Sequence, residues 1–174
     1  MSIKFRKVSD FNRGLIFELL TDAYLFDCRY EQNCSSDWQE FDNFFFDNLQ
    51  IADESGFITT LNDEAIGFVS WDPRNVPDYV EIGHNCIATK QKSNGYGKMQ
   101  LQEAVNRIIK NDVRKIVVTT NIDFIPAQKM YESVGFKIHQ KRKVEGFVRK
   151  HIDYVYSLEG RNTHNTIITH RDIR

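Results

Sequence analysis

A strand-to-helix turn rich in glycine and lysine is the segment of this sequence most able to carry chemistry. An apolar run ending at Ile87 leads through Lys90 to glycines at 95 and 97, and a helical pattern follows from Met99. Main-chain N–H groups and the partial positive charge of a helix N-terminus attract anions, and glycine lets a phosphate approach the backbone. The turn predicts a phosphate or pyrophosphate cradle. An ordinary strand–helix turn that contains Asn-Gly is the alternative.

Two nucleotide-binding motifs do not fit this turn. A dinucleotide fingerprint requires a third glycine three residues after Gly97, where the sequence has Gln100. A P-loop requires four residues between its glycines and then Lys-Ser/Thr, whereas Gly97 is followed by Lys98-Met99. A nucleotide-dependent kinase or dehydrogenase is therefore disfavoured.

Two other motifs, in order and separated by one expected strand, resemble those of the GNAT acetyltransferase superfamily. Residues 92–97 (Lys-Ser-Asn-Gly-Tyr-Gly) fit the family's acyl-CoA loop, with Lys92 in place of Arg or Gln. Residues 126–136 are similar to its second motif, Ala-x-x-x-Tyr-x-x-x-Gly-Phe. Phe124 stands where the family often has an Asn that contacts the pantetheine. The resemblance covers residues 3–158.

The resemblance implies that acetyl-CoA is the co-substrate, with no metal, and that it lies between strands 79–89 and 115–121. The backbones of Asn85, Cys86 and Ile87 would hold the pantetheine arm and the thioester carbonyl. An amine acceptor would then attack the thioester directly, without an acyl-enzyme. The remaining donor-binding residues implied are Lys92, Asn94, Gly95, Tyr96, Gly97 and Lys98.

Tyr131 is the implied general acid, because it matches the family's tyrosine near the CoA sulfur. A phenol is about matched to a thiolate in basicity, so it can protonate the departing thiolate. The alternative is an amphipathic tyrosine that packs against the sheet.

The general base is open between two residues. Glu81 has the spacing of the strand glutamate of the histone-acetyltransferase members, fourteen residues before Gly95, and a salt-bridged strand residue is its alternative. His84 is the rival, because its ordinary pKa is near neutral. Strict alternation turns His84 away from Glu81, although a bulge in this strand would alter that. Cys86 has no paired histidine pattern and is expected to be buried and inert.

The periodicity predicts one α/β domain with a mixed sheet, and the resemblance makes it a GNAT fold over residues 1–159. Residues 160–174 form a polar tail, either a terminal strand or disordered. Two helices are expected near the N-terminus, one capped by Ser9 or Asp10 and one starting at Ser36. The strands are expected at 3–8, 56–61, 65–71, 79–89, 116–120, 136–139 and 152–158, and the later helices after Gly95 and at 126–134.

The charge is divided unevenly along a nearly neutral chain of 174 residues with net charge −1. Residues 1–89 carry 6 basic and 16 acidic side chains, whereas residues 90–174 carry 17 and 8. The overall balance argues against nucleic-acid or membrane-surface partners. Three cysteines without metal-ligand spacing, and no apolar leader or span, predict a reduced, cytoplasmic protein without a metal site.

The acids concentrate in residues 22–54, which would form the acceptor wall in a GNAT fold. We therefore expect a small-molecule or peptide amine as acceptor, and the charge favours a cationic one such as a polyamine; a solvated helix face is the alternative. The expected function is acetyl transfer from acetyl-CoA to a primary amine by a monomer or homodimer. A non-catalytic acyl-CoA sensor or scaffold of the same fold is the rival.

Overall fold

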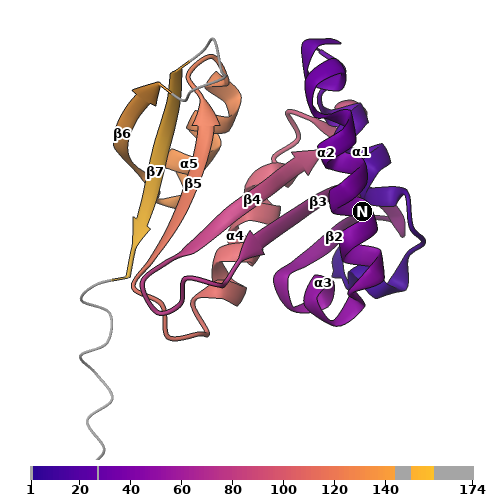
Figure 1. Ribbon diagram of the computed structural model, residues 1–174, viewed down its shortest axis with the longest axis horizontal. Coiled ribbons are helices and arrows are strands. Elements are labelled where there is room, and N and C mark those ends of the chain that lie inside the picture. Colours follow the sequence, from indigo (N-terminus) through magenta and orange to yellow (C-terminus); the bar gives the residue numbers. More distant parts are fainter. Residues whose placement is uncertain (1, 27, 144–149, 159–174) are drawn as a thin grey trace, which may run out of the picture.

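Seven strands form one mixed sheet in the order β1-β2-β3-β4-β5-β7-β6, within the residues that the structure describes (Figure 1). The computed structural model describes residues 2–26, 28–143 and 150–158, and only the backbone of residues 28–31. The strands are β1 Ile3–Arg6, β2 Gly56–Leu61, β3 Glu64–Asp72, β4 Val80–Ile87, β5 Lys115–Asn121, β6 Lys137–Lys143 and β7 Lys150–Ser157. Among the hydrogen-bonded pairs of neighbouring strands, only β4 and β5 run parallel. This confirms the prediction of a mixed sheet in an α/β domain.

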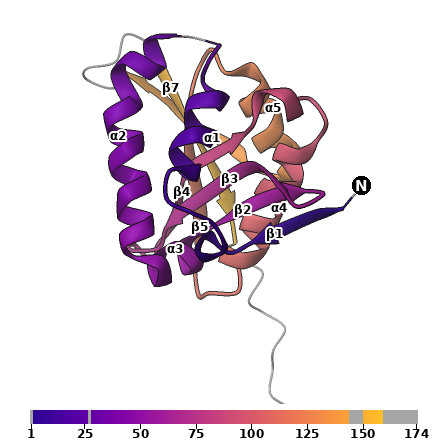
Figure 2. The ribbon, with the colours of Figure 1, turned by 90° about the vertical axis from the view of Figure 1, so that its right-hand side faces the viewer.

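Helices cover both faces of the sheet and give it two cores (Figure 2). The α-helices are α1 Leu15–Ala23, α2 Cys28–Asp47, α3 Leu49–Ser55, α4 Tyr96–Ile108 and α5 Ile125–Val134. One core joins α1 and α2 to Ile58 and Phe68. The other joins α4 and α5 to Ile82, Ile116 and Tyr154. We call the two sides of the sheet the α2 face and the α4 face.

The N-terminal helices begin at positions that the local sequence does not reveal. Residues Val8–Asp10 form a short 3-10 turn, and α1 starts only after Gly14, so Ser9 and Asp10 do not cap it. The acceptor for its first N–H groups comes from α2: the buried Asp42 carboxylate accepts from Gly14, Ile16 and Phe17. Tertiary packing thus replaces a local cap.

The second N-terminal helix is also longer than expected. It begins at Cys28 rather than Ser36, and a separate short helix, α3, follows from Leu49. The Ser36 capping-box prediction is wrong, because that residue lies inside the helix. The expectation of two N-terminal helices therefore gives way to three in the described part of the chain.

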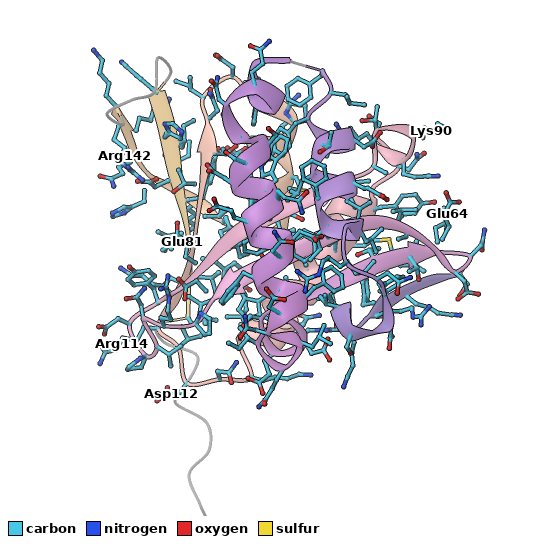
Figure 3. The ribbon with its side chains drawn as sticks, turned by 45° about the vertical axis from the view of Figure 1, so that its right-hand side comes forward. Glu64, Glu81, Lys90, Asp112, Arg114 and Arg142 are labelled. Carbon is cyan, nitrogen blue, oxygen red and sulfur yellow. The ribbon has the colours of Figure 1, made fainter. Side chains whose placement is uncertain are left out.

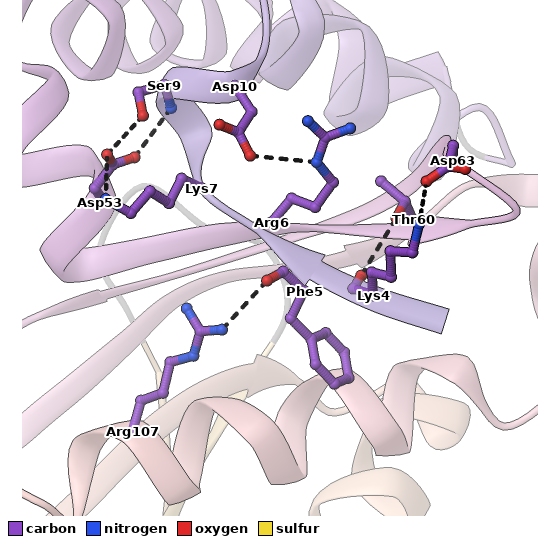
Figure 4. A network of polar contacts seen from close by, with 10 residues as sticks. All are labelled: Lys4, Phe5, Arg6, Lys7, Ser9, Asp10, Asp53, Thr60, Asp63 and Arg107. Atoms are coloured by element: carbon purple, nitrogen blue, oxygen red, sulfur yellow. Dashed lines mark hydrogen bonds and ion pairs between the residues drawn. The ribbon is translucent and has the colours of Figure 1, made fainter. Parts of the chain in front are cut away.

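The edge strand β1 is fastened to its neighbours by polar contacts (Figure 4). Lys4 Nζ pairs with Asp63, in the turn of the β2–β3 hairpin, at 2.6 Å. Asp53 of α3 accepts the N–H and hydroxyl of Ser9 at 3.0 and 2.7 Å. Arg107 of α4 donates to the Phe5 carbonyl at 3.5 Å. These contacts hold both helical layers to the sheet edge that lies farthest from the β4–β5 junction.

Candidate active site

The parallel strands β4 and β5 pair briefly and then diverge. We call this divergence the parting. The two strands pair over only three positions, from Val80–Ile116 to Ile82–Val118. Beyond Ile82, β4 continues to Ile87 along β3, while β5 continues along β7. In Figure 1 the two strands separate from this junction towards the top of the view. The parting leaves main-chain hydrogen-bonding groups of β4 without a strand partner on that side.

A bulge in β4 lies at the point of parting. The register between β3 and β4 shifts so that Gly83 and His84 lie opposite the single residue Ser70. The main-chain N–H of His84 donates to Ser70 Oγ at 3.3 Å and so anchors the extra residue. A bulge of this kind redirects the side chains that follow it.

The bulge gives β4 two groups of side chains. Ile82, Asn85 and Ile87 face α4 and α5. His84 and Cys86 face α1 and α2, and alternation from Ile82 puts Glu81 on that face too. Glu81 and His84 therefore share the α2 face.

The turn before α4 carries the geometry expected of an anion cradle. Ser93 and Gly95 adopt left-handed backbone angles, with φ of 66° and 83°. The Asn94 amide braces the turn by donating to the Gln91 and Lys92 carbonyls, each at 3.2 Å. The first helical hydrogen bond runs from Met99 N–H to Gly95 O, and Gly95 gives no side-chain cap. The main-chain donors at the start of α4 thus take no part in the helical ladder.

Lys92 fastens this turn to the end of α1. Its ammonium donates to the Ala23 carbonyl, and its main-chain N–H donates to Thr89 O at 3.4 Å. Asp22 completes a second link, because its carboxylate accepts from Thr89 N–H and its carbonyl accepts from the Thr89 hydroxyl at 2.7 Å. We call these two links the α1 clasp. The phosphate contact expected of Lys92 would require these partners to be released.

The second glycine of the turn serves helix packing. A Cβ at Gly97 would lie 3.0 Å from Met130 Sδ of α5, so the methionine side chain would have to shift to admit a larger residue. Ile87 Cγ1 of β4 would lie 3.6 Å away. Gly97 therefore lies in close contact with Met130 of α5, on the side where Asn85 and Tyr131 lie.

Phe124, the residue before α5, makes aromatic contacts with the segment that follows α1. Its ring lies 5.5 Å from that of Phe26 and 6.3 Å from that of Tyr24, both from the end of α1. Lys92 Nζ lies 5.3 Å over the Phe26 ring. Phe124 thus makes aromatic contacts where the family often has an amide side chain.

Tyr131 is buried among aromatic rings, with its hydroxyl at Asn85. Its ring lies 5.6 Å from Tyr154 and 6.0 Å from Phe136. Burial raises the pKa of Tyr131 to about 12, while the hydrogen bond with the Asn85 side chain lowers it. A bond that lowers a phenol pKa is one in which the phenol oxygen accepts. Tyr154 shows the opposite case: its hydroxyl donates to Glu132 at 3.1 Å, and that bond raises its pKa.

Cys86 shows what burial at this site does to a thiol. Its side chain is buried on the α2 face, and burial raises its pKa to about 12. Such a thiol is inert as a nucleophile. Burial also raises the pKa of Tyr131 to about 12, so desolvation acts in the same direction on this phenol and on the Cys86 thiol.

Glu81 lies exposed on the α2 face at the junction, opposite Asp72 of β3 and Val117 of β5. Its charge acts on Arg142 of β6, and Figure 3 shows Glu81 and Arg142 on the same side of α2. Among the described residues no ion pair involves Glu81; Arg142 instead pairs with Asp153 at 2.7 Å. The salt-bridged alternative for Glu81 therefore has no support in the described part of the chain.

His84 is held in an apolar, aromatic environment. Its ring lies 4.6 Å from Phe41 of α2 in an edge-on arrangement and 6.4 Å from Phe68. Burial lowers the pKa of His84 to about 4, so the imidazole is neutral at pH 7. A group of such low basicity is a poor proton acceptor from an ammonium ion.

Several acids of residues 22–54 have structural partners. Asp42 is buried at the start of α1, Asp47 pairs with Arg13, and Asp53 accepts from Ser9. Asp22 belongs to the α1 clasp. On α2 the exposed acids are Asp37, Glu40 and Asp47 among the side chains described. Part of the acidic excess in residues 22–54 therefore consists of side chains that hold helices and loops in place.

A cavity of about 440 Å³ lies away from these groups. It is bounded by the end of α5 and the outer strands, including Gly135, His139 and Tyr156. None of the sequence-predicted site residues lines it. Within the described ranges, no group of three or more His, Cys, Asp or Glu side chains could hold a metal ion. In the same ranges no helix has the length and apolar character to cross a membrane.

The family comparison agrees with this geometry. The model of the acetyltransferase (GNAT) family matches residues 16–136. The chain belongs to the GNAT acetyltransferase family. No curated protein matches the sequence of this GNAT domain.

Solved structures confirm the GNAT fold. A GNAT-family protein from Desulfovibrio desulfuricans superposes with a TM-score of 0.71 at 15% identity, covering 90% of this chain and 98% of that one. YncA of Salmonella typhimurium, solved with its cofactor acetyl-CoA, gives 0.71 at 14%, covering 91% and 94%. The ribosomal-protein-S18-alanine N-acetyltransferase of Escherichia coli gives 0.67 at 17%, covering 92% and 97%.

Sequence reasoning missed Gln100, which is fully buried in this GNAT domain. In the sequence, this position stands out only because it lacks the third glycine of a dinucleotide fingerprint. A polar residue among the apolar positions Leu101, Ala104 and Val105 of an amphipathic helix was the available signal, because a buried amide needs partners. The partners themselves come from three different strands and could not be read from α4 alone.

Proposed function

We propose that this protein transfers an acetyl group from acetyl-CoA to a primary amine by direct attack in a ternary complex. The observation that carries the proposal is the parting of β4 and β5, with Tyr131 on the α4 face and Glu81 on the α2 face of the same junction. A thioester placed in the parting would have a proton donor on one side and a proton acceptor on the other.

The donor would bind along the freed edge of β4 and at the turn before α4. The backbones of Asn85, Cys86 and Ile87 would take the pantetheine arm and thioester carbonyl, as the family membership suggests. The turn from Asn94 to Lys98 would take the pyrophosphate through main-chain N–H groups, supported by its left-handed angles and uncapped helix start. Lys92 would act indirectly, through the α1 clasp.

The chemistry needs three proton transfers: the nitrogen gives up two protons, and the departing sulfur gains one. An ammonium acceptor first loses one proton, and the neutral nitrogen then forms the C–N bond at the thioester carbonyl. As the C–S bond breaks, sulfur takes the electron pair and receives the Tyr131 proton, and the phenolate regains a proton given up by the nitrogen. One proton is released overall. The position of Tyr131, buried on the α4 face with its side chain hydrogen-bonded to Asn85, supports it in this role.

Glu81 is the proposed base, and His84 takes a different part. The Glu81 carboxylate is exposed on the face open to an acceptor. His84 is neutral and packed against Phe41, so we assign it to holding the bulge and lining the acceptor side. The acceptor would approach from the α2 face. A cationic acceptor would be attracted by Glu81 together with Asp37 and Glu40.

The test is acetyl-CoA-dependent thiol release over a panel of amines: polyamines, aminoglycosides, amino acids and peptides with free N-termini. We expect at least one amine to support turnover, with mass spectrometry showing an acetylated nitrogen. For a cationic acceptor, KM should rise with ionic strength. Acetyl transfer to oxygen or sulfur alone would contradict the proposal.

A non-catalytic acyl-CoA sensor of the same fold is the alternative. It predicts CoA binding by calorimetry, no turnover with any amine, and unchanged binding in Tyr131→Phe. The presence of both a buried Tyr131 and an exposed Glu81 at the junction favours the enzyme.

A further inference from the structure

The buried side chain of Gln100 connects α4 to three strands of the sheet. Its Nε2 lies 3.0 Å from Phe68 O and 3.1 Å from Cys86 O, and its Oε1 accepts from the Thr59 hydroxyl at 2.6 Å. Nε2 also lies 2.7 Å from Asn85 Oδ1. The two hydrogens of the NH2 group are shared among these three acceptor oxygens, and the fully buried amide is held in one orientation.

The direction of this network follows from its carbonyls. Phe68 O and Cys86 O can only accept, so they must face the NH2 group of Gln100 and not its oxygen. The same NH2 group faces Asn85, which must therefore present its own oxygen. The NH2 group of Asn85 is left to point to α5, where it lies 3.8 Å from Met130 Sδ and reaches Tyr131.

The consequence for Tyr131 concerns its proton. If Asn85 donates to the phenol oxygen, the phenol hydrogen is not used in that bond and can be donated elsewhere. If the Asn85 amide were reversed, its oxygen would accept the phenol hydrogen and remove it from use. The orientation of one amide thus decides whether Tyr131 can act as an acid.

We propose that Gln100 is a positioning residue that fixes the Asn85 amide so that Asn85 donates to Tyr131 and leaves the tyrosine hydrogen free for the departing thiolate. The inference rests on the proposed function and names the residue, Gln100, that keeps the general acid Tyr131 able to donate its proton. Gly67 makes room for it, because a Cβ there would lie 2.6 Å from Gln100 Oε1 and 2.8 Å from Cys86 O.

The kinetic test uses Gln100→Met, which keeps the length of the side chain but removes its polar atoms. We expect kcat for amine acetylation to fall at least tenfold while KM for acetyl-CoA stays within twofold. In a Tyr131→Phe background the same substitution should change kcat less than twofold, because the acid it serves is gone. Equal losses in both backgrounds would mean a merely structural role and would overturn the proposal.

The matched control is Gln102→Met, the same change on the exposed side of α4, where Gln102 donates to Asn106 at 3.2 Å. It should leave kcat within twofold. Thermal unfolding and CoA binding by calorimetry report whether each variant is folded. If Gln100→Met does not fold, Thr59→Val replaces it; loss of the hydroxyl that holds Gln100 Oε1 should lower kcat in the same non-additive way.

A spectroscopic test does not depend on turnover. In ¹⁵N-labelled wild-type protein, the side-chain amide hydrogens of Asn85 should show nuclear Overhauser effects to the Tyr131 ring, and these should be lost in Gln100→Met or Thr59→Val. Absence of the effects in the wild type would overturn the orientation. Their presence in a protein that acetylates no amine would instead count against the proposed function alone.

Discussion

His84 donates its main-chain N–H to the Ser70 hydroxyl, and this one bond marks where β4 stops alternating regularly. The extra residue brings the His84 side chain onto the face that carries Glu81, while Asn85 turns to the face that carries Tyr131. The bulge therefore places Asn85, the hydrogen-bond partner of Tyr131, on the α4 face, while Glu81 lies before the bulge on the α2 face.

Glu81→Gln tests the base on the α2 face. Loss of the carboxylate should lower kcat about 100-fold, as expected for removal of a general base, with little change in KM for acetyl-CoA. The matched control is Asp72→Asn, because Asp72 lies directly opposite Glu81 but is paired with Arg74. That variant should keep kcat within threefold. Equal losses in the two variants would indicate a general charge effect instead of proton transfer.

The pKa of His84 gives a pH dependence of stability. Its folded-state pKa of about 4 lies below the ordinary 6.5, so the unfolded chain takes up the proton first. The contribution of neutral His84 to the free energy of unfolding is fully present above about pH 6.5. It is lost as the pH falls towards 4, which lowers the free energy of unfolding by about 3 kcal/mol at most.

His84→Phe should remove this dependence while keeping an aromatic ring against Phe41. Urea unfolding at pH 7 and at pH 4.5 measures it: the wild type should lose more free energy of unfolding than the variant between the two. The same loss in both would show that His84 titrates normally in the folded protein. In contrast, substitution of the surface residue His139 should leave the wild-type dependence unchanged.

The sequence predicted the elements that carry the candidate site well where the signal is local. The glycine turn, the helix after Gly95 and the strand carrying Glu81 lie where periodicity placed them, because each depends on residues close together in the chain. The family resemblance was confirmed by the match over residues 16–136. The roles of Glu81, His84 and Tyr131 stay predictions.

What the sequence could not predict depends on contacts between distant segments. Asp42 caps a helix 26 residues earlier in the chain, and Gln100 reaches Thr59 over 41 residues. The engagement of Lys92 by Ala23 spans 69 residues. No periodicity within one element encodes such pairs. The tail at 160–174 and the domain boundary at 159 lie outside the described residues, so those predictions are untested.

The α1 clasp gives a prediction about donor affinity. In Lys92→Met with Asp22→Ala, the turn before α4 should lose its links to α1 and become less ordered before it binds. The Kd for CoA, measured by calorimetry, should rise about tenfold, because ordering the turn would then oppose binding. Lys110→Met, which removes a cation at the far end of α4, should leave Kd within twofold. An unchanged Kd in the double variant would show that the turn is ordered without the clasp.

Asp42 gives the sharpest stability prediction, because α2 offers its own control five residues later. Asp42→Ala leaves the N–H groups of Gly14, Ile16 and Phe17 without their acceptor in a buried setting, which should cost about 3 kcal/mol of unfolding free energy. Asp47→Ala removes an exposed pair with Arg13 and should cost about 0.5 kcal/mol, the usual value for surface ion pairs. Urea unfolding of both variants at pH 7 gives the comparison. Similar small losses would mean that water replaces the Asp42 carboxylate at the start of α1. The segment between β1 and α1 would then be held by its apolar contacts instead.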